Sequence, residues 1–426
     1  MSKSEINVGL IGFGTIGAGV VEIFNKNQSL LSQKTGKEVI LKKVADLDIT
    51  TDRGVKIDEN LLTTDVNEIL EDGEIDVVIE LMGGYEPART FILKALKNKK
   101  HVISANKALI AKHWEELIST ANENNVRIAF EASVGGGIPV LQTINENLAA
   151  NKIESVYGIM NGTANYILTK MTEEGSNFDE VLKEAQEKGY AEADPTFDIE
   201  GHDTAQKLII LTKLAFGKYV PQEDFHVEGI TKITPLDIEF ANKELDYSIK
   251  LLGIAKNIEG NLEIKVHPTF IEKDHLLSSV NDVFNAIHIV GDFVGPVLLY
   301  GQGAGRMATA SAVVGDLLDI AFNENERINY GPVTPQVDKV KSIEDISSKF
   351  YIRITSKNPK IEENVTDIFN KENIGIELIT TNESNSDSTT NIILVTKTAK
   401  ESQLKKTIEK VTELGDVEES LFIRIL

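Results

Sequence analysis

Three glycines near the start of the chain constrain its fold more than any other feature. Gly12, Gly14 and Gly17 form the pattern G-x-G-x-x-G, directly after the apolar segment INVGLI and at the start of a predicted helix. In a strand–turn–helix unit the first glycine permits a tight turn, the second lets the backbone approach a pyrophosphate, and the third lets the helix pack close to the strand. A glycine-rich structural turn is the alternative. The strand and helix on either side favour a dinucleotide site, with amides of Thr15 and Ile16 at the helix N-terminus.

The segments that follow alternate between apolar strands and helices. The predicted strands are residues 6–11, 38–46, 76–84, 101–111 (with its exit loop) and 126–134, and a helix is predicted near residues 86–98. Such alternation is typical of a parallel, doubly wound sheet. The sequence therefore predicts an α/β protein with a Rossmann domain over residues 1–140.

The character of the sequence changes after this domain. Residues 261–271 and 285–301 alternate in the manner of an antiparallel sheet, among predicted helices. We therefore expect a central α+β domain over residues 141–302, for substrate binding, catalysis and dimerisation. A helix rich in small residues at 303–325 is expected to pack back on the Rossmann domain.

The last part of the chain is predicted to be a separate module. Residues 331–347 contain two prolines and little periodicity, which is typical of a linker. From residue 348 to residue 426 the predicted order of elements is strand, helix, strand, strand, helix, strand. This βαββαβ order predicts a ferredoxin-like fold.

An acid-rich block occupies residues 189–207, with the sequence GYAEADPTFDIEGHDTAQK. Its five carboxylates within twelve residues are Glu192, Asp194, Asp198, Glu200 and Asp203. Asp203 and Lys207 are four residues apart at the start of an apolar run, so on a helix they share one face. Nearby carboxylates keep an amine protonated, and a protonated amine beside a small polar substrate can donate a proton. A solvated acidic loop is the alternative, but the aromatic, glycine and proline residues among the charges favour a functional site.

Asp46 ends the second predicted strand, where a carboxylate can accept hydrogen bonds from both ribose hydroxyls. A 2′-phosphate there would meet Asp46 and Asp48 and be repelled. No arginine occupies residues 46–52. We therefore predict a preference for NAD over NADP. The alternative is that Asp46 only caps its loop.

Composition excludes several classes of function. The net charge of −22 argues against nucleic acid and against anionic membrane surfaces as partners. The chain has no cysteine, which rules out disulfides, thiolate metal sites and aldehyde oxidation through a cysteine adduct. Its seven histidines lack the spacing of a transition-metal site. No apolar run reaches membrane-spanning length and no signal peptide is recognised, so a cytoplasmic protein is expected.

Five motifs fall in one order along the chain: the glycine-rich turn, SANKALIA, EASVGGGIP, NGTANYIL and the acid-rich block. With them the chain resembles homoserine dehydrogenase, over essentially all 426 residues. The C-terminal module is similar to an ACT regulatory domain. The resemblance implies an oxidoreductase that interconverts L-homoserine and L-aspartate 4-semialdehyde with NAD(P)H, in the biosynthesis of threonine and methionine.

The resemblance also implies which residues form the active site. The catalytic lysine of the family matches Lys207, and a second functional lysine matches Lys107. The substrate-binding carboxylates match Glu192, Asp198 and Asp203. In aldehyde reduction we expect Lys207 to donate the proton and Lys107 to polarise the carbonyl group. The alternative for Lys107 is a solvent-facing lysine at the start of a helix.

Further ligands follow from the same resemblance. Cofactor contacts are expected from Thr15, Ile16, Ser104, Lys107 and Gly303. A monovalent cation, Na⁺ or K⁺, is expected at the mainly backbone site Glu131, Val134, Gly136 and Ile138. A homodimer or homotetramer is expected, with an amino-acid effector at the ACT-like module.

Two other functions stay open from the sequence. One is a Rossmann dehydrogenase that acts on a different small amino-acid-derived aldehyde, which a substrate panel would distinguish. The other is a non-catalytic sensor of NADH and an amino acid, which would bind its ligands without turnover.

Overall fold

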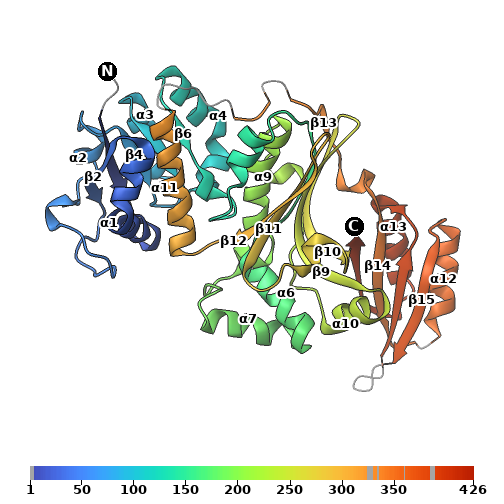
Figure 1. Cartoon of the computed structure of the whole chain (residues 1–426). Coiled ribbons are helices and arrows are strands. Elements are labelled where there is room, and N and C mark those ends of the chain that lie inside the picture. The colour runs from blue at the N-terminus through green and yellow to red at the C-terminus, as the bar shows by residue number, and fades with distance from the viewer. Residues whose placement is uncertain (1–3, 324–329, 333–334, 359, 384–388) are drawn as a thin grey trace. The chain divides into compact units, whose positions relative to one another are not determined.

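The computed structural model describes residues 4–323, 330–332, 335–358, 360–383 and 389–426 (Figure 1). The chain divides into two units, and each unit is built from three segments of the sequence. Unit 1 consists of Met1–Ile153, Gln206–Pro221 and Phe284–Gln336. Unit 2 consists of Glu154–Ala205, Gln222–Val283 and Val337–Leu426.

Unit 1 contains a parallel sheet with the strand order β3-β2-β1-β4-β5-β6. The strands are β1 (Glu5–Ile11), β2 (Glu38–Ala45), β3 (Leu62–Thr63), β4 (Val77–Glu80), β5 (His101–Ser104) and β6 (Ile128–Ala129). The connecting helices are α1 (Thr15–Thr35), α2 (Asn67–Leu70), α3 (Ala88–Lys97) and α4 (Lys107–Glu123), with a 3₁₀ turn at Glu59–Leu61. This arrangement confirms the predicted doubly wound fold. The strand order reverses between β1 and β4, which is where such sheets bind ligands.

Helix α11 (Arg306–Phe322) belongs to unit 1 although it comes late in the chain, and it packs along α1 (Figure 1). A Cβ atom on Gly19 of α1 would lie 2.9 Å from the carbonyl oxygen of Arg306. The small residue therefore lets the two helices approach closely. Val20, Val313 and Leu317 are buried in the shared core. Residues 324–325 of the predicted helix lie outside the described part.

The predicted strand at residues 126–134 is much shorter than expected. Only β6 (Ile128–Ala129) pairs with β5, and Glu131–Ser133 form a 3₁₀ turn. Gly135 and Gly136 then adopt positive φ angles of 73° and 55°, which turn the chain away from the sheet. Unit 1 is completed by α5 (Val140–Gln142), a π-helical turn (Thr143–Asn147) and the antiparallel hairpin of β11 (Phe284–Gly291) and β12 (Gly295–Gln302).

Unit 2 is built on a mixed sheet with neighbouring strands in the order β7-β9-β10-β18-β14-β16-β15. Their bounds are Ile153–Ile159, Tyr247–Ile258, Asn261–Glu272, Val417–Ile425, Ser347–Ser356, Thr390–Thr396 and Ile376–Glu383, in that order. Three short strands pair at the side: β8 (His226–Val227) and β13 (Lys339–Val340) with β10, and β17 (Ala399–Lys400) with β14. Strands β10 and β18 run parallel, so one sheet joins the middle of the chain to its last part.

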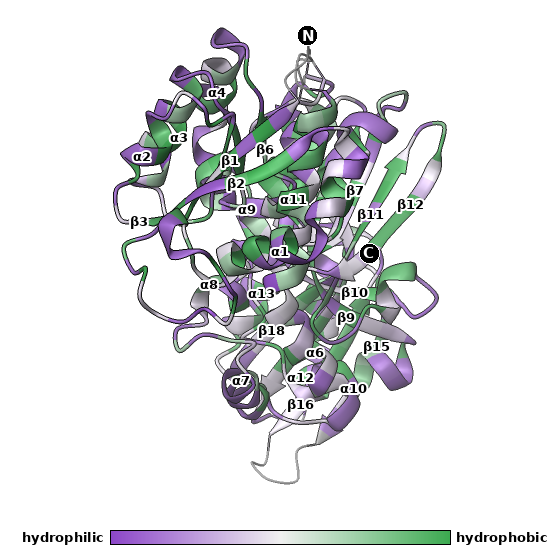
Figure 2. Ribbon diagram, turned by 60° about the vertical axis from the view of Figure 1, so that its left-hand side comes forward, coloured by the Kyte–Doolittle hydropathy of each residue, from purple (hydrophilic) through white to green (hydrophobic). Residues whose placement is uncertain are grey.

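The helices of unit 2 are α6 (Gly162–Glu174), α7 (Phe178–Glu187), α8 (Thr196–Ile199), α10 (Pro235–Glu244), α12 (Ile361–Lys371) and α13 (Glu401–Thr412). Short 3₁₀ turns occur at Gln222–Asp224, Leu276–Ser279 and Ile343–Asp345. Figure 2 colours most of α7 hydrophilic, which agrees with its charged sequence. Helix α9 (His202–Phe216) crosses from unit 2 to unit 1 between Ala205 and Gln206.

The C-terminal part of unit 2 has the order β14-α12-β15-β16-β17-α13-β18, with the spatial order β18-β14-β16-β15 of its main strands. Phe350, Val365 and Leu404 lie in its own apolar core. The segment before it, where a linker was predicted, includes β13 and one 3₁₀ turn; residues 333–334 lie outside the described part.

Candidate active site

The glycine-rich turn has the geometry of a dinucleotide site. Gly12 has a φ of +100°, and a Cβ atom there would lie 2.7 Å from the carbonyl carbon of Leu81. A Cβ atom on Gly17 would lie 2.1 Å from the carbonyl oxygen of Gly12, so no larger residue fits either position. At Gly14 a Cβ atom would meet nothing within 4 Å. The backbone there is open to a ligand.

Gly14 is the N-cap of α1 and has no side chain to accept hydrogen bonds from the first helical amides. The amides of Thr15 and Ile16 therefore lie at a helix N-terminus without a side-chain cap, which suits a phosphate. A cavity of about 360 Å³ opens beside Gly12, Gly14 and Asp46 at this end of the sheet. Its volume is in the range of small-molecule sites.

Asp46, which lines this cavity, bonds to the backbone of two segments of the chain. One carboxylate oxygen accepts a hydrogen bond from Phe13 N at 2.5 Å and the other accepts from Asp48 N at 2.9 Å. Its carboxylate thus ties the glycine-rich turn to the loop after β2. Asp48 in turn pairs with Arg53 at 3.2 Å, and Leu47 is 90% exposed.

A buried network holds the start of α4. Glu80, at the end of β4, accepts hydrogen bonds from Met82 N (2.8 Å) and from the Ser104 hydroxyl (2.7 Å). Asn106 N donates to Ser104 Oγ, and Asn106 Nδ2 donates to the carbonyl oxygen of Gly84 at 2.6 Å. Asn106 is also the N-cap of α4, whose first residue is Lys107.

Burial raises the pKa of the Glu80 carboxyl group, against the hydrogen bonds from Ser104 and the backbone. Glu80 is fully buried at the carboxyl end of a parallel strand, where Rossmann folds bind their ligands. The network therefore fixes Ser104 and Lys107, two of the predicted site residues, at the ligand-binding edge of the sheet.

Lys207 and Asp203 both lie on α9, one turn apart, and both are buried, with 9% and 5% of their surfaces exposed. Asn161, the N-cap of α6, donates hydrogen bonds from Nδ2 to Asp198 (2.7 Å) and to Asp203 (2.9 Å). One amide therefore brings together two of the three predicted substrate carboxylates.

The third predicted carboxylate, Glu192, is exposed. Its side chain makes no hydrogen bond or ion pair within the described part of the chain, and only its backbone oxygen accepts a bond, from Gln186. Tyr190 is 45% exposed and packs edge-on against Tyr166, with ring centroids 5.0 Å apart.

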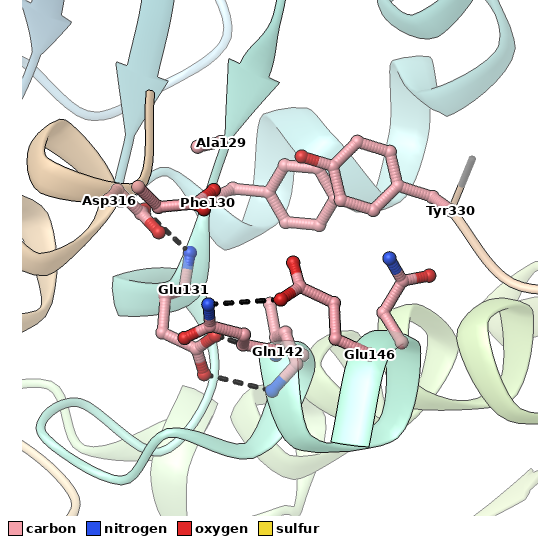
Figure 3. A pocket seen from close by; sticks show the side chains of 10 residues that line it. Ala129, Phe130, Glu131, Gln142, Glu146, Asp316 and Tyr330 are labelled. Atoms are coloured by element: carbon pink, nitrogen blue, oxygen red, sulfur yellow. Dashed lines mark hydrogen bonds between the residues drawn. The ribbon is translucent and has the colours of Figure 1, made fainter. Parts of the chain in front are cut away.

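Figure 3 shows Glu131, the first residue of the predicted cation site, beside Gln142, Glu146 and Asp316. The Glu131 carboxylate accepts hydrogen bonds from Leu141 N and Gln142 N, both at 2.8 Å. Burial raises the pKa of Glu131 to about 7, against these hydrogen bonds. Glu131 N donates to Asp316 at 2.9 Å. Burial also raises the pKa of Asp316 well above its usual range.

The other residues of this loop can offer a cation only backbone atoms. Val134 and Ile138 are buried apolar residues, which can offer a cation only their carbonyl oxygens. Gly136 packs on Gly303, because a Cβ atom on Gly136 would lie 2.5 Å from the Gly303 carbonyl oxygen. Gly303 has no room for a side chain either, since its Cβ atom would lie 1.9 Å from Asn285 Nδ2. Among the described residues no cluster of His, Cys, Asp and Glu side chains could hold a metal ion.

Sequence reasoning missed Glu80, Asn106 and the side-chain role of Asn161. Glu80 could have been found, because a lone acid directly after the apolar strand VVI marks the carboxyl end of that strand. Asn106 and Asn161 directly precede α4 and α6, and asparagine is a favoured cap at such a position. Their second hydrogen bonds depend on elements distant in the sequence.

Two family models match the chain. One, described as homoserine dehydrogenase, NAD binding domain, matches residues 12–131. The other, described as homoserine dehydrogenase, matches residues 139–318. Together they cover the glycine-rich turn, the start of α4, the acid-rich block and most of α11.

Similar proteins carry the same description. A homoserine dehydrogenase of Bacillus subtilis is 41% identical over 418 residues, which are 97% of this chain and 96% of the relative. The crystal structure of a homoserine dehydrogenase from Thiobacillus denitrificans has a TM-score of 0.90 and 38% identity, and covers 99% of this chain and 98% of its own. A hyperthermophilic archaeal homoserine dehydrogenase in complex with NADPH has a TM-score of 0.65 and 27% identity, over 76% of this chain and all of its own.

The doubly wound sheet, its glycine-rich turn and the matched NAD-binding domain define an oxidoreductase of the Rossmann class. The relatives that match over nearly the full length identify the family within this class. The chain belongs to the homoserine dehydrogenase family. Within the described residues, no helix combines the length and apolar character needed to span a bilayer.

Proposed function

We propose that this protein interconverts L-homoserine and L-aspartate 4-semialdehyde, with Lys207 as the group that exchanges a proton with the substrate oxygen. The observation that carries this proposal is the buried Lys207, one turn after the buried Asp203 on α9. A lysine in such a place is not a solvated surface charge. The proposed reaction is the one that membership of the homoserine dehydrogenase family indicates.

In the direction of reduction, negative charge grows on the aldehyde oxygen. The Lys207 ammonium group stabilises this charge and transfers a proton from Nζ as the alcohol forms. In the direction of oxidation the same nitrogen takes the proton back. Lys107 contributes a second positive charge that polarises the carbonyl group, from a helix start fixed by Asn106.

The substrate is an amino acid, and its ammonium group needs acceptors. Asp198 and Asp203, held together by Asn161, are suited to this group. We assign Asp198 to the ammonium group and Asp203 to orienting Lys207 or a substrate hydroxyl. Glu192 is exposed, so in this assignment it meets the substrate at the rim of the site.

The residues around the glycine-rich turn fit a dinucleotide. The amides of Thr15 and Ile16 hold the pyrophosphate, and Ser104, Lys107 and Gly303 complete the cofactor contacts in this proposal. When bound, the nicotinamide ring supplies or accepts the hydride. Asp46 is assigned to the ribose, although its carboxylate already accepts two backbone hydrogen bonds and must share its remaining lone pairs.

A preference for NADH over NADPH follows from Asp46, because its carboxylate would repel a 2′-phosphate, whereas the charge of Asp48 is compensated by Arg53. Steady-state kinetics with both cofactors test this prediction. We expect a higher kcat/KM with NADH in the wild type, and a smaller ratio in Asp46→Asn. A kcat/KM at least about tenfold higher with NADPH would overturn the assignment, since it would mean a site that favours the phosphate by more than 1 kcal/mol.

We infer three further properties. The loop carbonyls of Glu131, Val134, Gly136 and Ile138 bind Na⁺ or K⁺, which would hold this loop against the cofactor-binding edge of the sheet. The C-terminal βαββαβ segment acts as an ACT-type module for an amino-acid effector. The reaction serves threonine and methionine synthesis in the cytoplasm.

A substrate panel tests the proposed reaction. We expect NADH oxidation with L-aspartate 4-semialdehyde, and slower turnover with aldehydes that lack the α-ammonium or α-carboxylate group. Repeating the assay with threonine tests the effector, and dialysis against a buffer free of Na⁺ and K⁺ tests the cation. Binding of NADH without turnover of any of these aldehydes would refute the enzyme and favour a sensor.

A further inference from the structure

Strand β10 has a polar face that the fold buries. Glu263, Lys265, His267 and Thr269 alternate with apolar residues, the pattern of a strand with one face in water. In the structure these four residues are only 6%, 5%, 1% and 1% exposed. Burial of polar groups is unfavourable unless each finds a partner. Each polar side chain on this face therefore requires a partner.

A cavity of about 320 Å³ lies against this polar face. All of its walls belong to unit 2, from strands β9, β10, β14 and β18, from Thr398 before β17 and from Leu426 after β18. Its titratable side chains are those of Lys256, Glu263, Lys265, His267, Lys349 and Arg424. The volume is within the range of small-molecule sites.

Three of the charged groups at this cavity are neutralised by neighbours. Arg424 pairs with Glu401 and Glu228, both at 2.7 Å. Glu263 pairs with Lys341 at 3.0 Å, and Lys349 pairs with Glu377 at 2.8 Å. The remaining side-chain charges at the cavity are therefore those of two lysines.

Lys265 and Lys256 carry this remaining charge. In the part of the chain that the structure describes, the Lys265 ammonium group makes no hydrogen bond and no ion pair, although the residue is only 5% exposed. Burial, together with the nearby Lys256, lowers the pKa of Lys265 to about 8. Lys256 lies over the ring of Tyr157, with Nζ 5.0 Å from the ring centroid. The cavity is thus a positive region in a chain of net charge −22.

His267 lines the same cavity and is almost fully buried. Its Nδ1 lies 2.9 Å from the carbonyl oxygen of Pro268 and 2.9 Å from the hydroxyl oxygen of Thr269. Because a carbonyl oxygen can only accept, the contact with Pro268 favours the tautomer with the hydrogen on Nδ1. In the neutral ring Nε2 is then an acceptor. Burial lowers the pKa of His267 well below its usual range, which keeps the ring neutral. Within the described residues Nε2 has no hydrogen-bond partner.

We propose that this cavity binds a small organic anion, with a carboxylate or phosphate group on Lys265 and a hydroxyl or amino hydrogen on His267 Nε2. Such a ligand supplies the counter-charge to Lys265 and the donor to His267 Nε2 that the surrounding side chains do not. The site is separate from the reaction proposed above, because its residues come from the sheet and the C-terminal segment of unit 2.

Calorimetry on the full chain tests the site with three probes: glycolate, acetate and inorganic phosphate. We expect saturable binding of glycolate or phosphate, and the tighter of the two identifies the anionic group that the site prefers. Lys265→Met removes the ammonium group and should weaken binding by at least about tenfold. Lys232→Met makes the same change at an exposed position of unit 2 and should bind as the wild type does. No saturable binding of any probe, or equal binding by Lys265→Met, overturns the proposal.

Thermal unfolding without a probe shows whether a loss of binding is caused by misfolding of the variant. Lys265→Met should be at least as stable as the wild type, because the substitution removes an unpaired buried charge. A lower melting temperature than the wild type would mean that Lys265 supports the fold and would count against the site.

A second variant tests the acceptor. His267→Asn keeps a donor for the Pro268 carbonyl group but removes Nε2. The wild type should bind glycolate more tightly than acetate, because only glycolate carries a hydroxyl group. The variant should bind the two equally. An unchanged preference in His267→Asn would remove His267 from the proposal.

Discussion

Two asparagine side chains each cap a helix and hold a second element beside it. Asn161 caps α6 and bonds to Asp198 and Asp203, and Asn106 caps α4 and bonds to the carbonyl oxygen of Gly84. An amide suits this position because it offers an acceptor to the helix and two donors to its neighbours. A carboxylate or hydroxyl group could fill only part of the role.

The two roles of Asn106 can be separated by substitution. Asn106→Ala removes the cap and should lower the free energy of unfolding by about 1 kcal/mol. Asn106→Asp keeps an acceptor for Leu109 N but loses the donor to Gly84, so we expect near wild-type stability with reduced turnover. Chemical denaturation and steady-state kinetics measure the two effects. Full activity in Asn106→Asp would show that the Gly84 bond does not position Lys107.

Single residues could be predicted from the sequence where their type is dictated locally. The three glycines are such a case, because a tight turn, an open backbone and a close helix contact each exclude a side chain. Glu80 and Asn161 were missed because their partners, Ser104 and Asp203, are 24 and 42 residues away. Only the fold brings such pairs together.

At the scale of elements, buried ion pairs hold the last strand, β18, against its neighbours. Arg424 of β18 bonds to Glu401 of α13 and to Glu228, which follows β8. Burial by itself would raise the pKa of Glu228, but His226 and Arg424 outweigh it and lower the pKa to about 2. The ionised carboxylate is therefore favoured by the folded state.

This shift predicts a pH dependence of stability. Glu228 has a pKa of about 2 in the folded state and about 4.3 in the unfolded chain, so its contribution is complete above the unfolded value. It is lost as the pH falls from about 4.3 towards 2, where the unfolded chain binds the proton first. Glu228→Gln should flatten the curve of unfolding free energy against pH in this window. Parallel curves for variant and wild type would contradict the assigned pKa.

Elements with a clear period were predicted, and those with mixed environments were not. Strand β1 and helix α1 follow the expected pattern closely. Strand β9 was missed because both of its faces are buried and its sequence YSIKLLGIAKNI includes lysine and glycine, which blur the alternation. The polar face of β10 predicted solvent on one side, whereas β18 and the residues around it cover that side.

At the scale of the whole molecule, one surface of unit 1 suggests association with a second copy. Phe293 and Val294, neighbours in the turn of the β11–β12 hairpin, are 86% and 45% exposed. Large apolar side chains grouped on a surface mark interaction sites. We propose that the protein is a homodimer or homotetramer and that this hairpin contributes to the contact.

Substitution of the most exposed of these residues tests the assembly. Phe293→Ser should weaken self-association by at least about tenfold, since a buried aromatic residue at an interface contributes strongly. Sedimentation velocity over a range of concentrations measures the effect. A wild type that stays monomeric at high concentration would contradict the assembly, and an unchanged oligomer in Phe293→Ser would exclude the hairpin.

The role of Lys207 as proton donor is tested most directly by comparing the turnover of Lys207→Met with that of Lys213→Met. The second variant removes an amine from the same helix. We predict that Lys207→Met loses about 10²–10⁴ in kcat with L-aspartate 4-semialdehyde, while it still binds NADH as the wild type does. Lys213 pairs with Glu115 away from this role, and its variant should keep its activity. A kcat for Lys207→Met within about tenfold of the wild type would contradict the role of this lysine as proton donor.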